Sequence, residues 1–315
     1  IFLDEVQRCE GYEKAVDSLY IKDNVDIYIT GSNAYMLSGK LATLLSGRYV
    51  EIEMLPFSFK EFLQVQDINP NNITFAFREY LSFGGFPATT LLGHKEPLIR
   101  SYLDGIYNTI LIKDVAKRLG DADVGILEAV GKFLFSNVGS PVSVKKIADT
   151  INSAGRSISV NTISKYVNAL CDSYLFYKID RYDVQGRQHL KTNGKYYAVD
   201  SGLRNFLLAS STPDIGHVLE NIVCLELLRR GEKVTIGKVA QKEVDFVSEH
   251  AEGLTYYQVA ASVLEESTLQ RELAPLREIR DNHPKILLTM DDIPKTANYD
   301  GIRQINVVDW LLESN

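Results

Sequence analysis

The sequence predicts an α/β protein of several domains, and three stretches of the chain lead to this prediction. Short apolar strands alternate with helical segments over residues 1–59, which is typical of a parallel sheet. Two short helices and a hairpin follow at 142–200. From residue 217 the order is a helix, three strands, a helix and two strands. We expect the units to be 1–59, a helical lid at 60–141, 142–209 and 214–315.

The composition is that of a folded protein, with 45% hydrophobic residues, 24% charged residues and a net charge of −7. Nine lysines and arginines against five aspartates fall within 142–200, so this segment carries +4 and the rest of the chain −11. Any contact with a polyanion is therefore expected to be concentrated in this segment. Three cysteines without metal-ligand spacing, no signal-peptide pattern and no apolar run of the roughly 18 to 20 residues of a membrane span indicate a cytoplasmic protein without membrane contact.

Two carboxylates follow the first predicted strand, residues 1–3, in the manner of a Walker B strand. The carboxyl ends of parallel strands border the ligand crevice of such sheets. Asp4 is therefore expected to hold magnesium, and Glu5 to polarise the attacking water. The alternative is a buried strand that ends in two solvated acids. Further strands are predicted at 25–30 and 49–54, with helices near 12–19 and 34–45.

Four stretches occur in the order IFLDEV, YITGSN, LLSGRYVEIEMLPFSFKEF and FGGFP. Together they resemble a prokaryotic AAA-type ATPase family with a C-terminal domain of uncharacterised function. The order of segments in that family covers nearly the whole chain. The resemblance implies a partial P-loop NTPase sheet over 1–59, with ATP and magnesium as cofactors, and it is compatible with a homo-oligomer.

The resemblance also implies roles for residues near the later strands. Asn33 or Ser32, after the strand at 25–30, would hydrogen-bond the γ-phosphate and the lytic water; helix capping is the alternative, and both roles are compatible. Arg48 would reach the nucleotide of a neighbouring subunit and spread the transition-state charge. A solvated surface arginine is the alternative for Arg48.

The 315 residues contain no Gly-x-x-x-x-Gly-Lys-Ser/Thr loop, which the family carries ahead of the acidic strand. Without this loop the β- and γ-phosphates lose their cradle of backbone N–H groups and their lysine. We therefore expect that the chain begins inside the ATPase domain and binds ATP weakly by itself. The intact protein is expected to hydrolyse ATP.

Residues 142–209 have the order of a winged helix: helices at 144–152 and 161–174, then strands at 175–182 and 195–199. The second helix would be the recognition helix, and the hairpin tip at 185–188 the wing. Nucleic-acid contacts are expected from short polar and basic side chains. These are Asn161, Thr162, Lys165, Arg181, Arg187 and Lys191. A protein-docking or lid module is the alternative.

Residues 214–315 resemble the core of PD-(D/E)xK nucleases, which need converging acids for magnesium and a lysine for the attacking water. Asp245 and Glu220 fit two of the metal ligands. Gln258 stands in place of the second strand acid, and Ala260 in place of the lysine. We expect a domain that keeps the fold without the activity. The alternative is a magnesium-dependent nuclease whose lysine has migrated, with Lys242 as a candidate.

Two apolar features of this last segment are expected to belong to the core. Trp310 would anchor the last helix, and the helix at 265–280 would bury Leu269, Leu273, Leu276 and Ile279. The function predicted for the whole is an AAA-type ATPase that couples ATP hydrolysis to a nucleic-acid-related or regulatory conformational switch. An ATP-independent winged-helix DNA-binding protein and a magnesium-dependent DNA nuclease are the alternatives.

Overall fold

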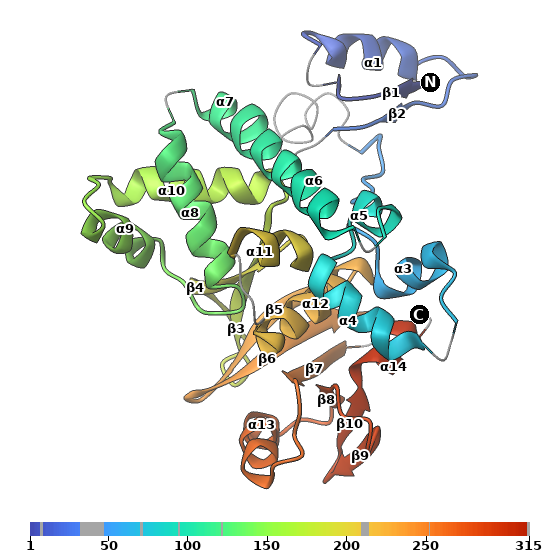
Figure 1. The fold of residues 1–315 in the computed structure, drawn as a ribbon, viewed down its shortest axis with the longest axis vertical. Coiled ribbons are helices and arrows are strands. Elements are labelled where there is room, and N and C mark those ends of the chain that lie inside the picture. Colours follow the sequence, from blue (N-terminus) through green and yellow to red (C-terminus); the bar gives the residue numbers. More distant parts are fainter. Residues whose placement is uncertain are drawn as a thin grey trace.

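The computed structural model describes residues 1–6, 9–31, 47–69, 72–93, 95–120, 122–208, 214–251 and 253–313. Its first unit is a small parallel sheet of β1 (Phe2–Leu3) and β2 (Tyr28–Ile29), joined through α1 (Tyr12–Tyr20). Phe2 pairs with Tyr28, and Leu3 with Ile29. This unit lies at one end of the molecule (Figure 1).

The strand predicted at 49–54 does not form within the described residues. Val50, Ile52 and Met54 alternate along an extended segment, and their side chains are 87%, 75% and 85% exposed. An extended segment becomes a strand only where a neighbouring backbone pairs with it, and no such pairing is present here among the described residues.

A run of helices follows, and local signals start several of them. Ser58 begins α3 with a capping box, because its hydroxyl accepts a hydrogen bond from the Glu61 N–H at 3.1 Å and the Glu61 carboxylate accepts one from the Ser58 N–H at 2.8 Å. Asp123 caps α8 with a single hydrogen bond, which its carboxylate accepts from the Ile126 N–H at 3.0 Å. The helices are α3 (Phe59–Gln66), α4 (Ile73–Phe83), α5 (Pro87–Leu91), α6 (Glu96–Asn108), a π-helix (Thr109–Ala116), α7 (Lys117–Leu119) and α8 (Val124–Ser136).

Two further helices lead into a long hairpin. Ser143 caps α9 (Val144–Ser153) and Ser159 caps α10 (Val160–Asp172), each accepting a hydrogen bond at 3.1 Å from a backbone N–H three residues on. The hairpin consists of β3 (Phe176–Asp183) and β4 (Gln188–Ala198), and α11 (Ser201–Leu208) follows it.

The hairpin is one edge of an eight-stranded sheet with the order β4-β3-β5-β6-β7-β8-β10-β9. The sheet is mixed. β6 is antiparallel to both of its neighbours, β5 and β7, and β9 is antiparallel to β10. β3 is parallel to β5, and β8 is parallel to both β7 and β10. The sheet therefore combines two strands that precede residue 209 in the sequence with six strands that follow residue 214. The elements are α12 (Ile215–Arg229), β5 (Lys233–Val239), β6 (Lys242–His250), β7 (Gly253–Ala260), α13 (Glu266–Glu278), β8 (Lys285–Thr289), β9 (Thr296–Tyr299), β10 (Ile302–Asn306) and α14 (Val307–Leu312).

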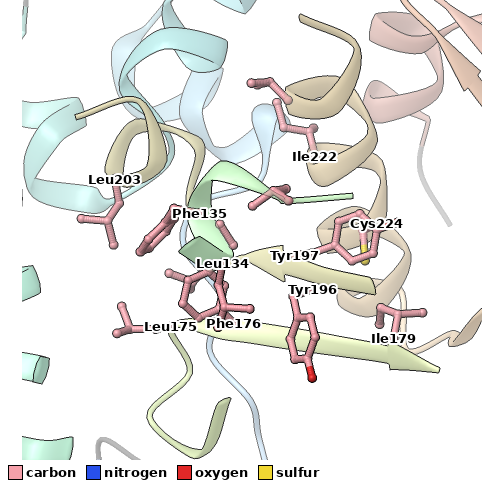
Figure 2. Close-up of a cluster of buried hydrophobic side chains, with 14 of the residues drawn as sticks. Leu134, Phe135, Leu175, Phe176, Ile179, Tyr196, Tyr197, Leu203, Ile222 and Cys224 are labelled. Atoms are coloured by element: carbon pink, nitrogen blue, oxygen red, sulfur yellow. The ribbon is translucent and has the colours of Figure 1, made fainter. Parts of the chain in front are cut away.

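Helices cover both faces of this sheet. One large core contains residues of the helices between α3 and α12, of α14 and of one face of the sheet. Figure 2 shows the part of this core that lies between α8, the hairpin, α11 and α12. Trp310 is buried in this core, as predicted. A second core lies under α13, which buries Leu269, Leu273, Leu276 and Ile279 as predicted. The predicted α/β class is confirmed, and no helix of the described part is both long and apolar enough to cross a membrane.

Candidate functional site

The first candidate site lies where β1 and β2 end side by side. The parallel register brings Asp4 and Thr30 together at the carboxyl edge, where the Thr30 hydroxyl donates a hydrogen bond to the Asp4 carboxylate. The same hydroxyl oxygen accepts one from the Glu5 N–H at 3.2 Å. Glu5 has a left-handed backbone, with φ of 51°, which turns the chain directly after Asp4. Carboxylate and hydroxyl oxygens are the ligands that magnesium prefers.

The other residues predicted for ATP chemistry are placed less completely. Ser32 and Asn33 lie outside the described residues. Arg48 contacts α1 of its own chain, with its guanidinium 3.4 Å from Asp17 and 5.6 Å from the ring centre of Tyr20. The side chains of this ion pair are about half exposed, so the pair contributes little to stability. Sequence reasoning missed Thr30, although a hydroxyl at the strand end of YITGSN was the available signal.

The second candidate site is a buried group of four charged residues, which we call the lysine–carboxylate centre: Lys195 on β4, Glu220 on α12, and Glu243 and Asp245 on β6. The Lys195 ammonium lies 2.9 Å from Glu220 Oε1, 2.7 Å from Glu243 Oε1 and 3.9 Å from Asp245 Oδ1. The Lys195 side chain is only 4% exposed.

The position of α12 explains how these residues meet. This helix packs against β4, β5, β6 and β7, so Glu220 lies between the hairpin and the central strands. Asn221 fixes the helix to the end of β4, because its side chain accepts a hydrogen bond from the Ala198 N–H at 2.7 Å and donates one to the Ala198 carbonyl at 2.9 Å. The hydroxyl of Tyr197 donates to Glu220 Oε1 at 2.6 Å.

The charges of the centre influence one another. Burial lowers the pKa of Lys195, but the carboxylates of Glu220, Asp245 and Glu243 outweigh burial and raise it, so the ammonium stays charged. Burial and the Glu220 carboxylate raise the pKa of Asp245 well above its usual range, although Lys195 acts in the opposite direction. The centre thus favours a charged Lys195 and a protonated Asp245.

The side chains of Gln258 and Lys242 pair with residues of α13 and do not complete the centre. The Gln258 amide donates to Glu272 at 2.8 Å, and its carbonyl oxygen is buried without a hydrogen-bond partner in the described part of the chain. Lys242 pairs with Glu278 of α13 at 2.6 Å. The lysine beside Asp245 is therefore Lys195, which the sequence order concealed because it belongs to the preceding hairpin.

Comparisons with known proteins match two parts of the chain to family models. A family model described as an AAA domain matches residues 1–63, and one described as a domain of unknown function (DUF8612) matches residues 74–214. An uncharacterized protein of Haemophilus influenzae is 44% identical over 313 residues, which cover 99% of this chain and 77% of that protein. The uncharacterized protein MJ1544 of Methanocaldococcus jannaschii is 31% identical over 329 residues, which cover 98% of this chain and 71% of that protein.

The chain belongs to an AAA-type ATPase-like family. Within this AAA-type chain, the match covers Asp4 and Thr30, whose side chains are hydrogen-bonded to each other. The match of residues 1–63 includes Glu5, Ser32, Asn33 and Arg48 as well.

The residues predicted to contact nucleic acid are distributed over two places. Asn161 and Lys165 lie on the exposed side of α10, while the Thr162 hydroxyl is within 2.9 Å of the capping Ser159 hydroxyl. Arg181 is drawn toward the lysine–carboxylate centre, 3.7 Å from Glu243. Arg187 is exposed at the hairpin turn. The side chain of Lys191 is not among those that the structure describes.

Proposed function

We propose that the protein is an ATPase of the AAA type that couples ATP hydrolysis to a conformational switch. The observation that carries the proposal is the hydrogen bond between Thr30 and Asp4 across the ends of two parallel strands. A hydroxyl on the neighbouring strand fixes the orientation of the carboxylate before a ligand arrives, which lowers the cost of binding. The family match over residues 1–63 supports the same assignment.

Each residue of the strand-end site has a proposed role. Asp4 holds magnesium, which when bound neutralises charge on the nucleotide phosphates. Glu5 orients the attacking water, and Thr30 positions Asp4. Ser32 and Asn33 hydrogen-bond the γ-phosphate. Arg48 acts on the nucleotide of a neighbouring subunit in a homo-oligomer, which requires that its exposed pairing with Asp17 opens.

The test measures ATP binding and hydrolysis by the protein expressed from its complete reading frame. Glu5→Gln should abolish hydrolysis and retain ATP binding, whereas Asp4→Asn should lose magnesium-dependent binding. Thr30→Val, which keeps the shape and removes the hydroxyl, should weaken magnesium-dependent binding about 10-fold, the effect of losing about 1.4 kcal/mol. Glu10→Gln, an exposed acid of the same unit, is the matched control. Unchanged hydrolysis in both Asp4→Asn and Glu5→Gln would refute the proposal.

A second candidate function is DNA binding by α9, α10 and the β3–β4 hairpin, which we propose to be a winged helix. It is supported by the exposed Asn161 and Lys165 on a helix that Ser159 caps, and by the local charge of +4 in 142–200. Duplex DNA binding by fluorescence anisotropy should weaken steeply between 50 and 200 mM salt, by roughly tenfold or more. Lys165→Ala should weaken it, and Lys233→Ala, exposed on β5, should not. Binding that is insensitive to salt argues against this function.

We also propose that α12, β5 to β7, α13 and β8 form a core of the PD-(D/E)xK nuclease type. The order of these elements, and the approach of Glu220 on α12 to Asp245 on β6, support this assignment. Gln258 in place of an acid argues that the core retains its fold without nuclease chemistry, because an amide oxygen brings no charge to a metal.

A further inference from the structure

A nuclease-type core implies a divalent cation between its acids, and the residues of the lysine–carboxylate centre do not fit one. The Lys195 ammonium is within 3 Å of both Glu220 and Glu243 and 3.9 Å from Asp245. Among the described residues, no three or more His, Cys, Asp and Glu side chains are arranged to hold a metal ion. A cation is already present, and it is a side chain.

Each carboxylate of the centre has a protein donor at one or both of its oxygens. Glu220 Oε1 accepts hydrogen bonds from Lys195 and from the Tyr197 hydroxyl, at 2.9 and 2.6 Å. Asp245 Oδ2 accepts one from the Val259 N–H at 2.8 Å. Glu243 has Lys195 at one oxygen and Arg181 3.7 Å from the other. A metal ion would have to displace these donors to reach its ligands.

The charge of the centre is also nearly balanced without a metal. Lys195 and Arg181 face the three carboxylates of Glu220, Glu243 and Asp245. Gln258, 7% exposed, offers a neutral carbonyl oxygen whose amide is already held by Glu272.

We propose that the Lys195 ammonium takes the place of the divalent cation in this centre, so that the C-terminal sheet is held together without metal and does not cleave nucleic acid. Lys195 thereby ties the hairpin to α12 and β6. Removing it should leave three carboxylates close together with no ammonium between them, so that they can move toward an added divalent ion and bind it. The inference does not depend on ATP hydrolysis, and its readouts are metal binding and thermal stability.

The experiment uses the chain of residues 1–315 and Mn²⁺ as the probe, measured by electron paramagnetic resonance and thermal unfolding. The unsubstituted chain and the Asp245→Asn chain should bind the same amount of Mn²⁺, because the centre binds none. The melting temperature of the unsubstituted chain should be the same in EDTA and in 5 mM Mg²⁺. Lys195→Ala should lower the melting temperature by about 6 °C or more, and added Mn²⁺ should restore part of the loss. Lys233→Ala, which breaks an exposed pair with Glu249, is the matched control and should change neither quantity.

Two results would overturn the proposal. One is Mn²⁺ binding, or Mg²⁺-dependent cleavage of plasmid DNA, by the unsubstituted chain that Asp245→Asn abolishes. The other is a Lys195→Ala chain that melts like the unsubstituted one and binds no added Mn²⁺. If Lys195→Ala does not fold, Lys195→Met, which keeps the aliphatic length, takes its place with the same expected results.

Discussion

Asp200 connects two segments that are more than a hundred residues apart, and removing its carboxylate should destabilise the whole core. Its side chain is 2% exposed. It accepts hydrogen bonds from the N–H groups of Gly85 at 2.7 Å and Leu203 at 2.8 Å, and further ones from Gly202 and Phe86. The carboxylate thus holds the FGGFP turn against the first turn of α11.

The magnitude of the loss follows from these four donors. Asp200→Ala removes every acceptor, and we assume that water entering the vacated space satisfies half of the N–H groups. Each of the two remaining buried donors costs about 1 to 3 kcal/mol, so the free energy of unfolding should fall by about 2 to 6 kcal/mol. Urea unfolding followed by the fluorescence of Trp310, the single tryptophan, measures the loss in the same core. Asp149→Ala, an exposed acid on α9, is the control and should stay within about 0.5 kcal/mol.

The fall in the free energy of unfolding caused by Asp200→Ala should also depend on pH, because burial raises the pKa of Asp200 from 3.8 to about 6. A raised folded-state pKa means that the stability from this group is fully present below the unfolded value and is lost as pH rises through the folded one. The penalty of Asp200→Ala should therefore shrink between pH 4 and pH 7, by about 3 kcal/mol at full ionisation. A penalty below about 1 kcal/mol at both pH values, equal to that of Asp149→Ala, would refute this role.

Two further substitutions test contacts of the same core. Asn221→Leu should lower the free energy of unfolding by about 2 to 4 kcal/mol in urea, since the Ala198 N–H and carbonyl lose their partners; an unchanged midpoint would show that β4 needs no such support. Gly202→Ala should lower the melting temperature by about 4 °C or more, because a Cβ there overlaps the Phe83 carbonyl oxygen, whereas Gly216→Ala, whose Cβ meets nothing closer than 3.6 Å, should not. Equal melting temperatures for the two glycine variants would contradict the overlap.

Local patterns in the sequence predicted much of the secondary structure. Ser58, Ser143 and Ser159 start helices because a side-chain oxygen satisfies a backbone N–H three residues on, which is a purely local event. The apolar row on α13 and the buried Trp310 follow from periodicity. The prediction of a strand at 49–54 was wrong because strand formation is not local. Alternating apolar residues indicate a strand, but the strand forms only where a neighbouring backbone supplies hydrogen bonds.

The sequence alone determined the AAA-type assignment and the place of Asp4 at a strand end, since both rest on short stretches that can be read in order. Only the tertiary structure decided that Thr30 orients Asp4, that Asp200 holds the FGGFP turn, and that Lys195 fills the centre between Glu220 and Asp245. The residues of these pairs lie from 25 to 115 positions apart, a separation over which no local pattern acts. The packing of helices and strands determines which distant side chains come into contact. In this chain α12 brings the residues of the centre together, because it packs against both the hairpin and the central strands of the sheet.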